Sequence, residues 1–344
     1  MTTNLAAYGN TFATELLEIT DDLSVLDDSG KWFVAGWFAG PVLAFKFANW
    51  SDEAPMAGSW VGPSDWYSDM DAPQYVSAVE AAREEIAQGN VYEVNICRRI
   101  RATWPDSPNS DSFSLYLKIL QEHPAEHAAY LRLSDVRLES FGLPANIEII
   151  SASPELFLRR MGSRIESAPI KGTAPTDGDF LDKDVSENIM IVDLVRNDLS
   201  AVSKVASVHV PKFLQRHEIP GISHLVTTVA AELKPEAGWQ EIFEATFPPG
   251  SVTGAPKSSA LRIIDQLESP RNIYCGTMGY VDVENQQAEL SVTIRTFWRE
   301  DDDIVFGTGA GITWGSDALQ EWQETELKAA KLIGIASSKV SAHV

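Results

Sequence analysis

The stretch IEIISASPELFLRRMGSRIESAPI, residues 147–170, is typical of β-strands that follow one another without an intervening helix. Residues 147–153 read as one strand and 156–170 as a hairpin. Similar clusters recur along the chain and do not alternate strictly with helices, which favours an α+β fold built on a large, mostly antiparallel sheet system with flanking helices. The other predicted strands are 91–100, 128–133, 222–233, 277–283, 288–298 and short buried strands within 31–50, and the predicted helices are 73–89, 112–123, 183–200, 239–247 and 317–336.

The composition describes a globular and acidic protein. The chain has 344 residues, of which 44% are hydrophobic, so a disordered or low-complexity chain is excluded. Its formal net charge of −22 disfavours binding to nucleic acid or to an anionic membrane surface. Two cysteines are too few for a disulfide framework or a zinc knuckle, and neither a membrane-length apolar run nor a leader pattern occurs. We therefore expect a cytoplasmic protein.

Residues 51–73, SDEAPMAGSWVGPSDWYSDMDAP, are rich in Pro, Gly and Ser and form the best candidate boundary. A helix is predicted directly after this loop, with Pro73 in its first turn and Gly89 at its end. We expect residues 1–71 to be a short N-terminal segment and residues 72–340 to be the main domain.

Lys171 lies in PIKGTAPTDGD (169–179), just after a predicted strand. A lysine is a nucleophile only when it is neutral, so a catalytic Lys171 must sit where burial or a nearby cation lowers its pKa. Its neighbours Ile170 and Gly172 suit such a setting. On these residues alone, a solvated lysine in a turn is the more common arrangement.

Two predicted helices each carry acidic residues three positions apart, Asp184 with Glu187 and Glu321 with Glu324. Residues three apart lie on one helical face, so two such helices facing each other would present four carboxylates to one hard cation. Mg²⁺ prefers oxygen ligands and usually keeps waters, which leaves room for a substrate carboxylate. An acidic chain contains many such pairs by chance, and Glu324 with Lys328 also reads as an ordinary surface pair.

Two segments rich in small residues indicate close backbone approach rather than nucleotide binding. In FPPGSVTGAPKSS (247–259), Pro256 stands where a phosphate loop requires glycine, so a nucleotide site is rejected. We expect a tight loop that opens a helix there, and the first amides of such a helix suit a carboxylate. In FGTGAGITWGSD (306–317), Gly307, Gly309 and Gly311 alternate along a predicted strand and leave one face open to a ligand or to another backbone.

Taken together and in this order, these segments resemble the chorismate-utilising enzymes, which include anthranilate synthase component I, aminodeoxychorismate synthase component I, and the isochorismate and salicylate synthases. The resemblance covers residues 72–336 and implies a β-sandwich core flanked by helices, with residues 1–71 as a shortened N-terminal segment of the family fold. In larger relatives that segment contributes to a tryptophan pocket, so a tryptophan site is not expected here. The motifs that carry the resemblance are SPELFL, PIKGT, ENIMIVDLVRNDL, PPGSVTGAPK, GTMGY, SVTIRT, GTGAGI and QETELKA.

At position 171 the chain resembles the aminodeoxychorismate synthase branch of that family, which has lysine there. The anthranilate synthases have alanine at this position. Asn188 in ENIMIVDL points to the same branch, because the anthranilate enzymes carry histidine there. Isochorismate and salicylate synthases place a lysine base in the strand that here reads YEVNI, where this chain has Glu93. The aminodeoxychorismate synthases more often have glutamine at that position, so Glu93 departs from the pattern and is a candidate catalytic residue of unassigned role.

The resemblance implies that chorismate and ammonia give 4-amino-4-deoxychorismate. Neutral Lys171 would add at C2 of the ring as the C4 hydroxyl leaves, and ammonia would then enter at C4 and expel the lysine. His224 is implied as the acid for the departing hydroxyl. The implied substrate-binding residues are Thr173, Ser251, Tyr274, Arg295, Gly309, Ala310, Gly311 and Lys328.

Mg²⁺ is the implied cofactor, held by Glu187 and Glu324 with Asp184 and Glu321 in support, where it would grip the ring carboxylate. The chain has no cysteine nucleophile in a glycine-rich elbow, so a separate glutamine amidotransferase subunit is the implied partner that supplies ammonia. No lyase segment follows residue 344, so we expect the reaction to stop at aminodeoxychorismate. Two alternatives stay open: an anthranilate-type synthase and a non-catalytic chorismate-binding partner.

Overall fold

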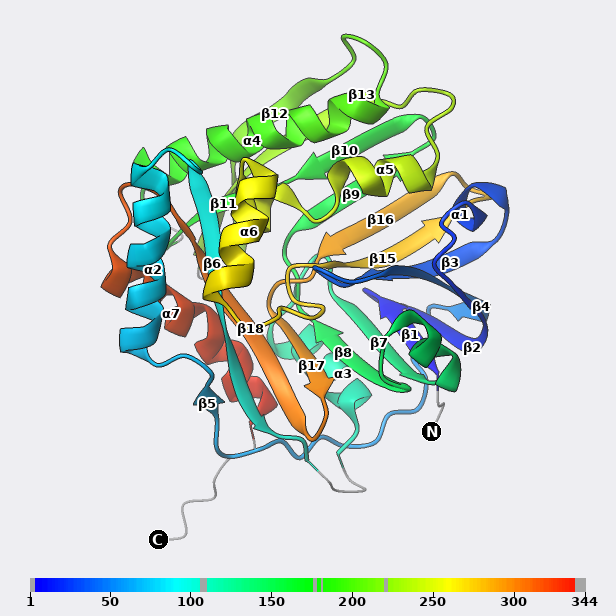
Figure 1. Ribbon diagram of the computed structural model, residues 1–344. Helices are drawn as coiled ribbons and strands as arrows, with labels where there is room; N and C mark the ends of the chain where they lie inside the picture. The colour runs from blue at the N-terminus through cyan, green and yellow to red at the C-terminus, as the bar shows by residue number, and fades with distance from the viewer. Residues whose placement is uncertain (1–3, 106–109, 176–177, 181, 220–221, 338–344) are drawn as a thin grey trace, which may run out of the picture.

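The strands form two sheets joined along one strand, with helices on the outside (Figure 1). The computed structural model describes residues 4–105, 110–175, 178–180, 182–219 and 222–337, and the side chains of these residues except 173–175, 182, 219 and 222. Every strand pairing recorded among them is antiparallel. The predicted α+β class with a sandwich core and flanking helices is confirmed.

The first sheet contains the N-terminal strands and ends at the strand that carries Glu93. Its pairings run from one neighbour to the next, and two short strands, β5 (Tyr67–Ser68) and β14 (Gly254–Ala255), pair with its last member. In spatial order its strands are β4 (Val42–Ser51), β2 (Thr11–Thr20), β1 (Leu5–Tyr8), β7 (Ala129–Ser134), β8 (Asn146–Ser151), β17 (Thr296–Glu300), β18 (Asp303–Ile312) and β6 (Glu93–Thr103).

The second sheet starts from the other edge of β4 and carries Lys171 near its far end. The predicted strand pair over 277–298 and the predicted hairpin over 156–170 both lie in it. In spatial order its strands are β3 (Lys31–Gly36), β15 (Thr277–Asp282), β16 (Gln287–Val292), β9 (Leu156–Met161), β10 (Arg164–Ala168) and β13 (Ile222–Glu232), and the last of these also pairs with β11 (Ile170–Pro175) and β12 (His209–Ile219).

Helices cover the outer faces, and α2 (Ala72–Ala87), α7 (Ala318–Ala336) and the start of α4 (Asp182–Val202) lie together at one end of the molecule, on the left of Figure 1. Two of them carry the predicted acidic pairs: α4 packs on β13, and α7 packs on β18. The helix after the 51–73 loop begins as predicted, because Asp71 accepts from the backbone N–H of Gln74 and completes a capping box. The helices are α1 (Val25–Asp28), α2 (Ala72–Ala87), α3 (Ser112–Glu122), α4 (Asp182–Val202), α5 (Trp239–Thr246), α6 (Lys257–Leu267) and α7 (Ala318–Ala336), with 3₁₀ turns η1 (Val136–Phe141) and η2 (Gly250–Val252).

Two crossovers from one sheet to the other position the candidate site. The chain passes from β8 to β9 through residues 152–155, and from β16 to β17 through residues 293–295. The two crossovers are tied together by backbone hydrogen bonds from Ala152 N to Arg295 O (3.0 Å) and from Val292 N to Glu155 O (3.0 Å). The predicted continuous strand over 288–298 is therefore wrong in one respect, because it breaks where Arg295 adopts a φ of +53°.

The N-terminal segment is part of the same sheet system, since β1 pairs with β7 and β3 pairs with β15. The buried core lies between the sheets and includes Phe33, Phe45 and Leu158, each 0% exposed. Within the described part of the chain, no helix combines the length and the apolar character needed to cross a lipid bilayer.

Candidate active site

Lys171 and Glu93 form a buried ion pair where the two sheets come together. The Lys171 Nζ donates a hydrogen bond of 2.5 Å to Glu93 Oε1, and the side chains are 8% and 0% exposed. Lys171 comes from β11 of one sheet and Glu93 from the start of β6 of the other. Glu93 Oε2 is buried and has no hydrogen-bond partner among the described residues. A buried carboxylate oxygen without a donor is free to accept a proton or to face a ligand.

The charge state of Lys171 differs from the prediction. Burial lowers the pKa of Lys171, but the carboxylates of Glu93 and Glu187 outweigh it and hold that pKa above its ordinary value. The condition set for a catalytic lysine, a pKa lowered by burial or by a nearby cation, is therefore not met by the surrounding side chains, because the nearest charges are acidic rather than cationic. A nucleophilic Lys171 has to give up its proton first, and Glu93 already lies in hydrogen-bond contact to take it.

The three alternating glycines of β18 make room for this pair and its neighbours. A Cβ on Gly311 would lie 2.7 Å from Glu93 Oε1 and 3.2 Å from Lys171 Nζ. A Cβ on Gly307 would lie 2.2 Å from the ring of Tyr274, which stacks on Trp298 at 6.5 Å between centroids. The predicted close approach along one face of this strand is confirmed.

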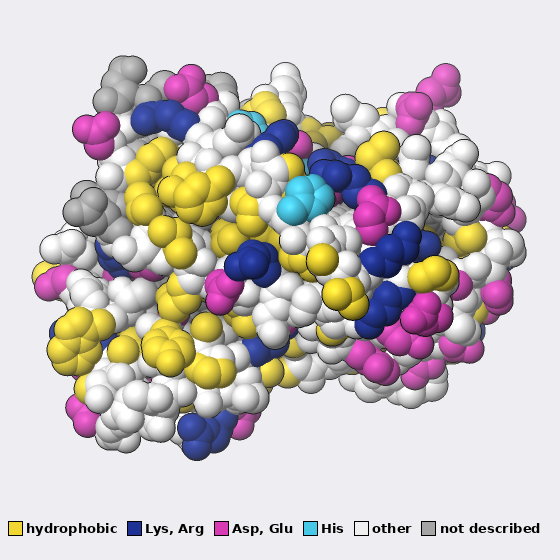
Figure 2. All heavy atoms as spheres, turned by 90° about the horizontal axis from the view of Figure 1, so that it is seen from above, with side chains coloured by type: hydrophobic (Ala, Val, Ile, Leu, Met, Phe, Trp, Pro, Cys, Tyr) yellow, Lys and Arg dark blue, Asp and Glu magenta, His cyan; other side chains and the backbone are white. Residues whose placement is uncertain are grey.

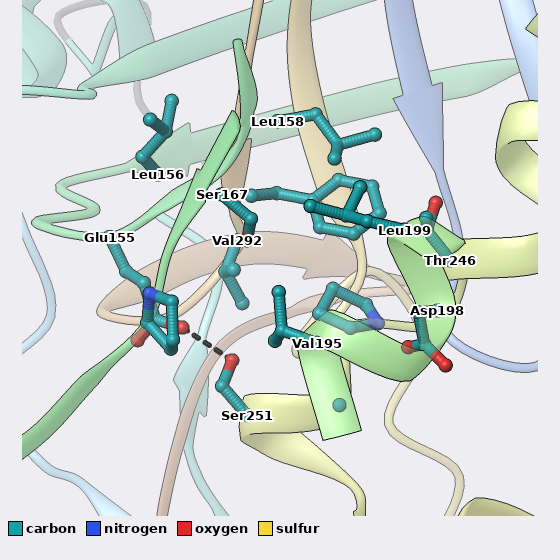
Figure 3. A pocket seen from close by; sticks show the side chains of 14 residues that line it. Glu155, Leu156, Leu158, Ser167, Val195, Asp198, Leu199, Thr246, Ser251 and Val292 are labelled. Atoms are coloured by element: carbon teal, nitrogen blue, oxygen red, sulfur yellow. Dashed lines mark hydrogen bonds between the residues drawn. The ribbon is translucent and has the colours of Figure 1, made fainter. Parts of the chain in front are cut away.

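Glu155 is a buried acid that the sequence reasoning did not single out, although it lies in the SPELFL motif. Its side chain points toward Ser251, whose hydroxyl donates to Glu155 Oε1 (Figure 3). Burial raises the pKa of Glu155 to about 7, partly offset by Ser251 and Lys171. A cavity of about 20 Å³ beside it has room for about one water molecule and not for a substrate. Ser251, predicted to bind substrate, instead directs its hydroxyl to this carboxyl.

Arg295 lies close to both Glu155 and His224. Burial and the positive charge of Arg295 lower the pKa of His224 to about 4, so the imidazole is neutral near pH 7. Arg295 Nη1 lies 3.5 Å from His123 Nε2, and none of the acidic side chains described by the structure pairs with it. A partly buried guanidinium without a carboxylate partner suits an incoming carboxylate. Thr173 pairs with His224 through the backbone, but its side chain lies outside the described residues.

Lys328 joins the same site from α7. Its Nζ donates to the carbonyl of Gly309 at 2.9 Å and pairs with Glu324 at 2.7 Å. The strand β18 pairs with β17 on one edge and with β6 on the other, and its pairing with β17 ends at Phe306. Among the described strands, the segment from Gly309 to Gly311 is therefore paired with β6 alone, and its other edge is open. Because amides alternate between the two edges of a strand, part of this segment faces away from β6 and can receive a carboxylate.

The predicted acidic residues divide into two groups. Glu187 and Glu321, 7% and 3% exposed, both lie against the ammonium of Lys183, at 3.5 Å for Glu187 Oε1 and in direct contact for Glu321. Glu324 is half exposed and turned to Lys328, which lowers the pKa of its carboxyl. Asp184 lies against Gly172, where a Cβ would come within 2.7 Å of it.

The donor chemistry of this acidic group fits a hard divalent cation. Glu187 Oε1 is buried without a hydrogen-bond partner among the described residues, and burial raises the pKa of Glu187 to about 7. Among those residues, however, no three His, Cys, Asp or Glu side chains converge on one metal position. The residues for an oxygen-rich site are present, and Lys183 lies between two of them.

Comparison with known proteins identifies the family. The sequence model of the chorismate binding enzyme family matches residues 46–334. The chain belongs to this family. It is 36% identical over 275 residues to aminodeoxychorismate synthase component 1 of Escherichia coli K12, which covers 76% of this chain and 57% of that protein. It is 33% identical over 282 residues to anthranilate synthase component 1 of Aquifex aeolicus, covering 78% and 54%.

Solved structures of other chorismate enzymes share the fold. Anthranilate synthase component I of Streptococcus pneumoniae superposes with a TM-score of 0.74 at 22% identity, over 91% of this chain and 84% of the other. The menaquinone-specific isochorismate synthase MenF of E. coli gives 0.77 at 18% identity, over 97% and 88%. The chain spans between 54% and 60% of the length of the first curated relatives it matches.

Within this chorismate-binding family member, the structure brings most of the predicted residues to one place. Lys171, Glu93, His224, Arg295 and Lys328 surround the end of β11, with contributions from both sheets and from α7. Asn188 holds α4 on β13 instead of facing this place, since it donates to Leu225 O at 3.3 Å and accepts from Thr227 at 2.6 Å. Sequence reasoning missed Glu155, Lys183 and His123. Only Glu155 had a sequence signal, because it sits in a motif that carried the resemblance.

Proposed function

We propose that this chain is the synthase component that converts chorismate and ammonia into 4-amino-4-deoxychorismate. The observation that carries the proposal is the buried Lys171, held by Glu93 at 2.5 Å between the two sheets. A lysine in that position is what the resemblance associates with the aminodeoxychorismate synthase branch. The 36% identity to a curated protein of that name supports the same assignment.

Lys171 and Glu93 would act together in the first chemical step. Lys171 passes one proton to Glu93 and becomes neutral, and its Nζ lone pair then bonds to C2 of the ring. Both double bonds of the ring diene shift, from C1=C2 and C5=C6 to C1=C6 and C4=C5, and the C4–oxygen bond breaks. Ammonia next bonds to C4, both double bonds shift back, and the C2–nitrogen bond breaks to release the lysine as an amine. Dividing one difficult displacement into two steps is the gain of covalent catalysis.

Glu155 is better suited than His224 to protonate the departing hydroxyl. A group with a pKa of about 7 is half protonated at neutral pH, whereas a histidine with a pKa of about 4 carries almost no extra proton there. With a proton from Glu155, the C4 hydroxyl leaves as water. Neutral His224 would then accept or donate a hydrogen bond to the substrate rather than supply the proton.

Arg295, Lys328 and the open edge at Gly309–Gly311 would hold the two carboxylates of chorismate. Arg295 has no acidic partner among the described residues and offers a bidentate grip. Tyr274 lies near Arg295, where its ring is fixed between Gly307 and Trp298. These groups place positive charge locally inside a chain whose net charge is −22, so that a dianionic substrate has one favourable place to bind.

Mg²⁺ would be held by Glu187 and Glu321, with Glu324 and Asp184 in support, after the Lys183 ammonium has moved away from these two carboxylates. When bound, it supplies Lewis-acid attraction for a ring carboxylate. We further propose a cytoplasmic location and a separate glutamine amidotransferase subunit as the ammonia source. The words "component 1" in the names of the relatives support a two-component arrangement.

Product analysis tests the proposed function. The chain would be supplied with chorismate, Mg²⁺ and ammonium, and the product identified by mass and chromatography with and without an added lyase. We expect aminodeoxychorismate, which the lyase converts to 4-aminobenzoate. Anthranilate as the main product would support the anthranilate-type alternative, and chorismate binding without turnover would support a non-catalytic partner.

The variant Lys171→Ala tests the covalent role in the same assay. We expect it to lose most of the amination at C4 and to shift the remaining product toward anthranilate, because ammonia would then add directly at C2. A variant with unchanged product and rate would contradict the role of Lys171.

A further inference from the structure

Lys183 occupies the space between two of the residues that would hold the metal. Its Nζ contacts the carboxylate of Glu321 and lies 3.5 Å from Glu187 Oε1. Lys183 and Glu187 are one turn apart on α4, whereas Glu321 lies in the first turn of α7. The ammonium therefore bridges the two helices that carry the predicted acidic pairs.

Charge explains why a cation is needed at this point. Glu187 and Glu321 are buried, and two buried carboxylates that face one another repel unless a positive charge lies between them. The other two lysines of the site have their own acidic partners, since Lys171 pairs with Glu93 and Lys328 with Glu324. Lys171 also attracts Glu187 electrostatically, but among the described residues Lys183 is the lysine that forms ion pairs with both carboxylates.

An ordinary surface pair within one helix does not account for the arrangement. The spacing of Lys183 and Glu187 would give such a pair along α4. The shorter contact, however, is to Glu321 on the other helix, which helical spacing does not dictate. The Lys183 side chain is also 30% exposed, so its flexible stem has a path by which the ammonium can turn out to water.

We propose that Lys183 is a resident cation that closes the Glu187–Glu321 site and swings out when a divalent metal binds. The inference rests on the proposed function, because it takes these two carboxylates as metal ligands. An ammonium and a divalent cation repel strongly at such short range and cannot share the site. The apparent metal affinity is then the intrinsic affinity reduced by the fraction of molecules in which Lys183 is out.

Metal binding to a lysine variant tests the proposal without reference to turnover. Mn²⁺ binding would be followed by its electron paramagnetic resonance signal, and Mg²⁺ binding by calorimetry, for the wild type, Lys183→Met and Lys212→Met. Lys212 is exposed on β12, so Lys212→Met removes the same charge at a position away from the site. If Lys183 closes the site in 90–99% of molecules, Lys183→Met should bind about 10- to 100-fold more tightly, with Lys212→Met unchanged.

The outcomes separate this inference from the metal role itself. If the wild type binds the metal and Lys183→Met binds it no more tightly, the inference is overturned, but Glu187 and Glu321 still qualify as metal ligands. If neither the wild type nor any variant binds the metal, both the Lys183 inference and the metal role are overturned. The proposed reaction is then tested separately by the product analysis.

A labelling experiment on the wild type distinguishes displacement from a simple loss of charge. Acetylation of each lysine by a water-soluble acyl ester would be followed by mass spectrometry, with Mg²⁺ or with NaCl of the same ionic strength. We expect the labelling rate of Lys183 to rise severalfold as Mg²⁺ saturates the site, while that of Lys212 stays constant. An unchanged rate at Lys183 under saturating Mg²⁺ overturns the proposal even if Lys183→Met binds metal more tightly.

Discussion

In the proposed mechanism, the pairing of Glu93 with Lys171 controls when the lysine can react. The carboxylates around Lys171 raise its pKa, so the amine stays protonated until its proton has somewhere to go. In the proposed mechanism this arrangement keeps the nucleophile in its protonated, unreactive form. The proton acceptor is in contact from the start, which makes proton transfer a short step within the buried pair.

The variant Glu93→Gln should lower the pKa of Lys171. Removing a negative charge next to an ammonium disfavours the protonated form. The rise of kcat/KM with pH should therefore move to lower pH, measured for aminodeoxychorismate formation between pH 7 and pH 10. An unchanged pH profile would show that Glu93 does not hold the proton of Lys171.

The variant Glu155→Gln should be more stable than the wild type at alkaline pH. The folded pKa of Glu155, about 7, lies above its ordinary value of 4.5 because the group is buried. An acid whose pKa is raised on folding costs stability as pH rises from the unfolded to the folded pKa, and the cost remains above both values. Glutamine can still accept the hydrogen bond from Ser251 but carries no charge.

Denaturant unfolding at pH 5 and pH 8 measures this difference. We expect Glu155→Gln to gain about 1–3 kcal/mol over the wild type at pH 8 and much less at pH 5. The same variant should lose about 10²-fold or more in turnover, since it has no proton to donate. A stability gain that is equal at both pH values would contradict the raised pKa.

At the scale of elements, β18 provides the space in which the site is built. Gly311 leaves room for Glu93 and Lys171, and Gly307 leaves room for the ring of Tyr274. The two positions differ in what a methyl group would meet. At Gly311 it meets the ends of two side chains, which can move, whereas at Gly307 it meets an aromatic ring 6% exposed and stacked on Trp298.

Alanine substitutions should separate activity from stability along this strand. Gly311→Ala should displace the Lys171–Glu93 pair and reduce turnover at least about tenfold, with a modest change in melting temperature. Gly307→Ala should lower stability by about 1–3 kcal/mol through overpacking. Gly315→Ala is the matched control, because nothing lies within 4 Å of a Cβ there. Loss of turnover in the control would show that the effect is not local to the site.

Local patterns in the sequence were sufficient for most elements but not for the crossovers. The strand run in 147–170 and the alternating glycines of 306–317 each depend on near neighbours, and the structure has them as predicted. The break at Arg295 was not foreseen, because 288–298 contains no Gly or Pro that would interrupt a strand. The break arises because the two halves of the segment pair with different sheets. The strand β12 was missed, since its polar sequence carries no strand pattern and it is defined by its pairing with β13.

The candidate site was predictable to the extent that the resemblance named its residues. The spacing of Lys171 and Glu93, 78 positions apart, carries no information on their contact. For the same reason the sequence could only state that a catalytic Lys171 needs a lowered pKa, and the acids that raise this pKa were not foreseen. The bridging role of Lys183 also arises only when α4 and α7 meet, which no local pattern specifies.

At the scale of the whole molecule, apolar side chains are exposed at the end of the sandwich where α7, which carries Lys328 of the site, begins (Figure 2). Seen from above, yellow apolar side chains gather on the left of the molecule, the end at which α2, α7 and the start of α4 meet (Figures 1 and 2). Trp314 and Leu319 are 65% and 55% exposed and lie just past the end of β18, which carries Gly311. Exposed apolar groups beside the proposed site of ammonia addition suit the docking of the proposed amidotransferase subunit.

The double variant Trp314→Ser/Leu319→Ser should therefore weaken binding of the amidotransferase subunit without lowering the ammonium-dependent rate. With the amidotransferase subunit and glutamine, the double variant should need about tenfold more partner to reach half of the maximal rate, the usual cost of losing an apolar anchor. With ammonium as the nitrogen source its rate should equal that of the wild type, because neither side chain belongs to the site. Val205→Ser is the matched control, since Val205 is 98% exposed and follows the far end of α4. If the double variant and the control respond alike to glutamine, the partner docks elsewhere, and the end of the molecule that carries the site is open to substrate alone.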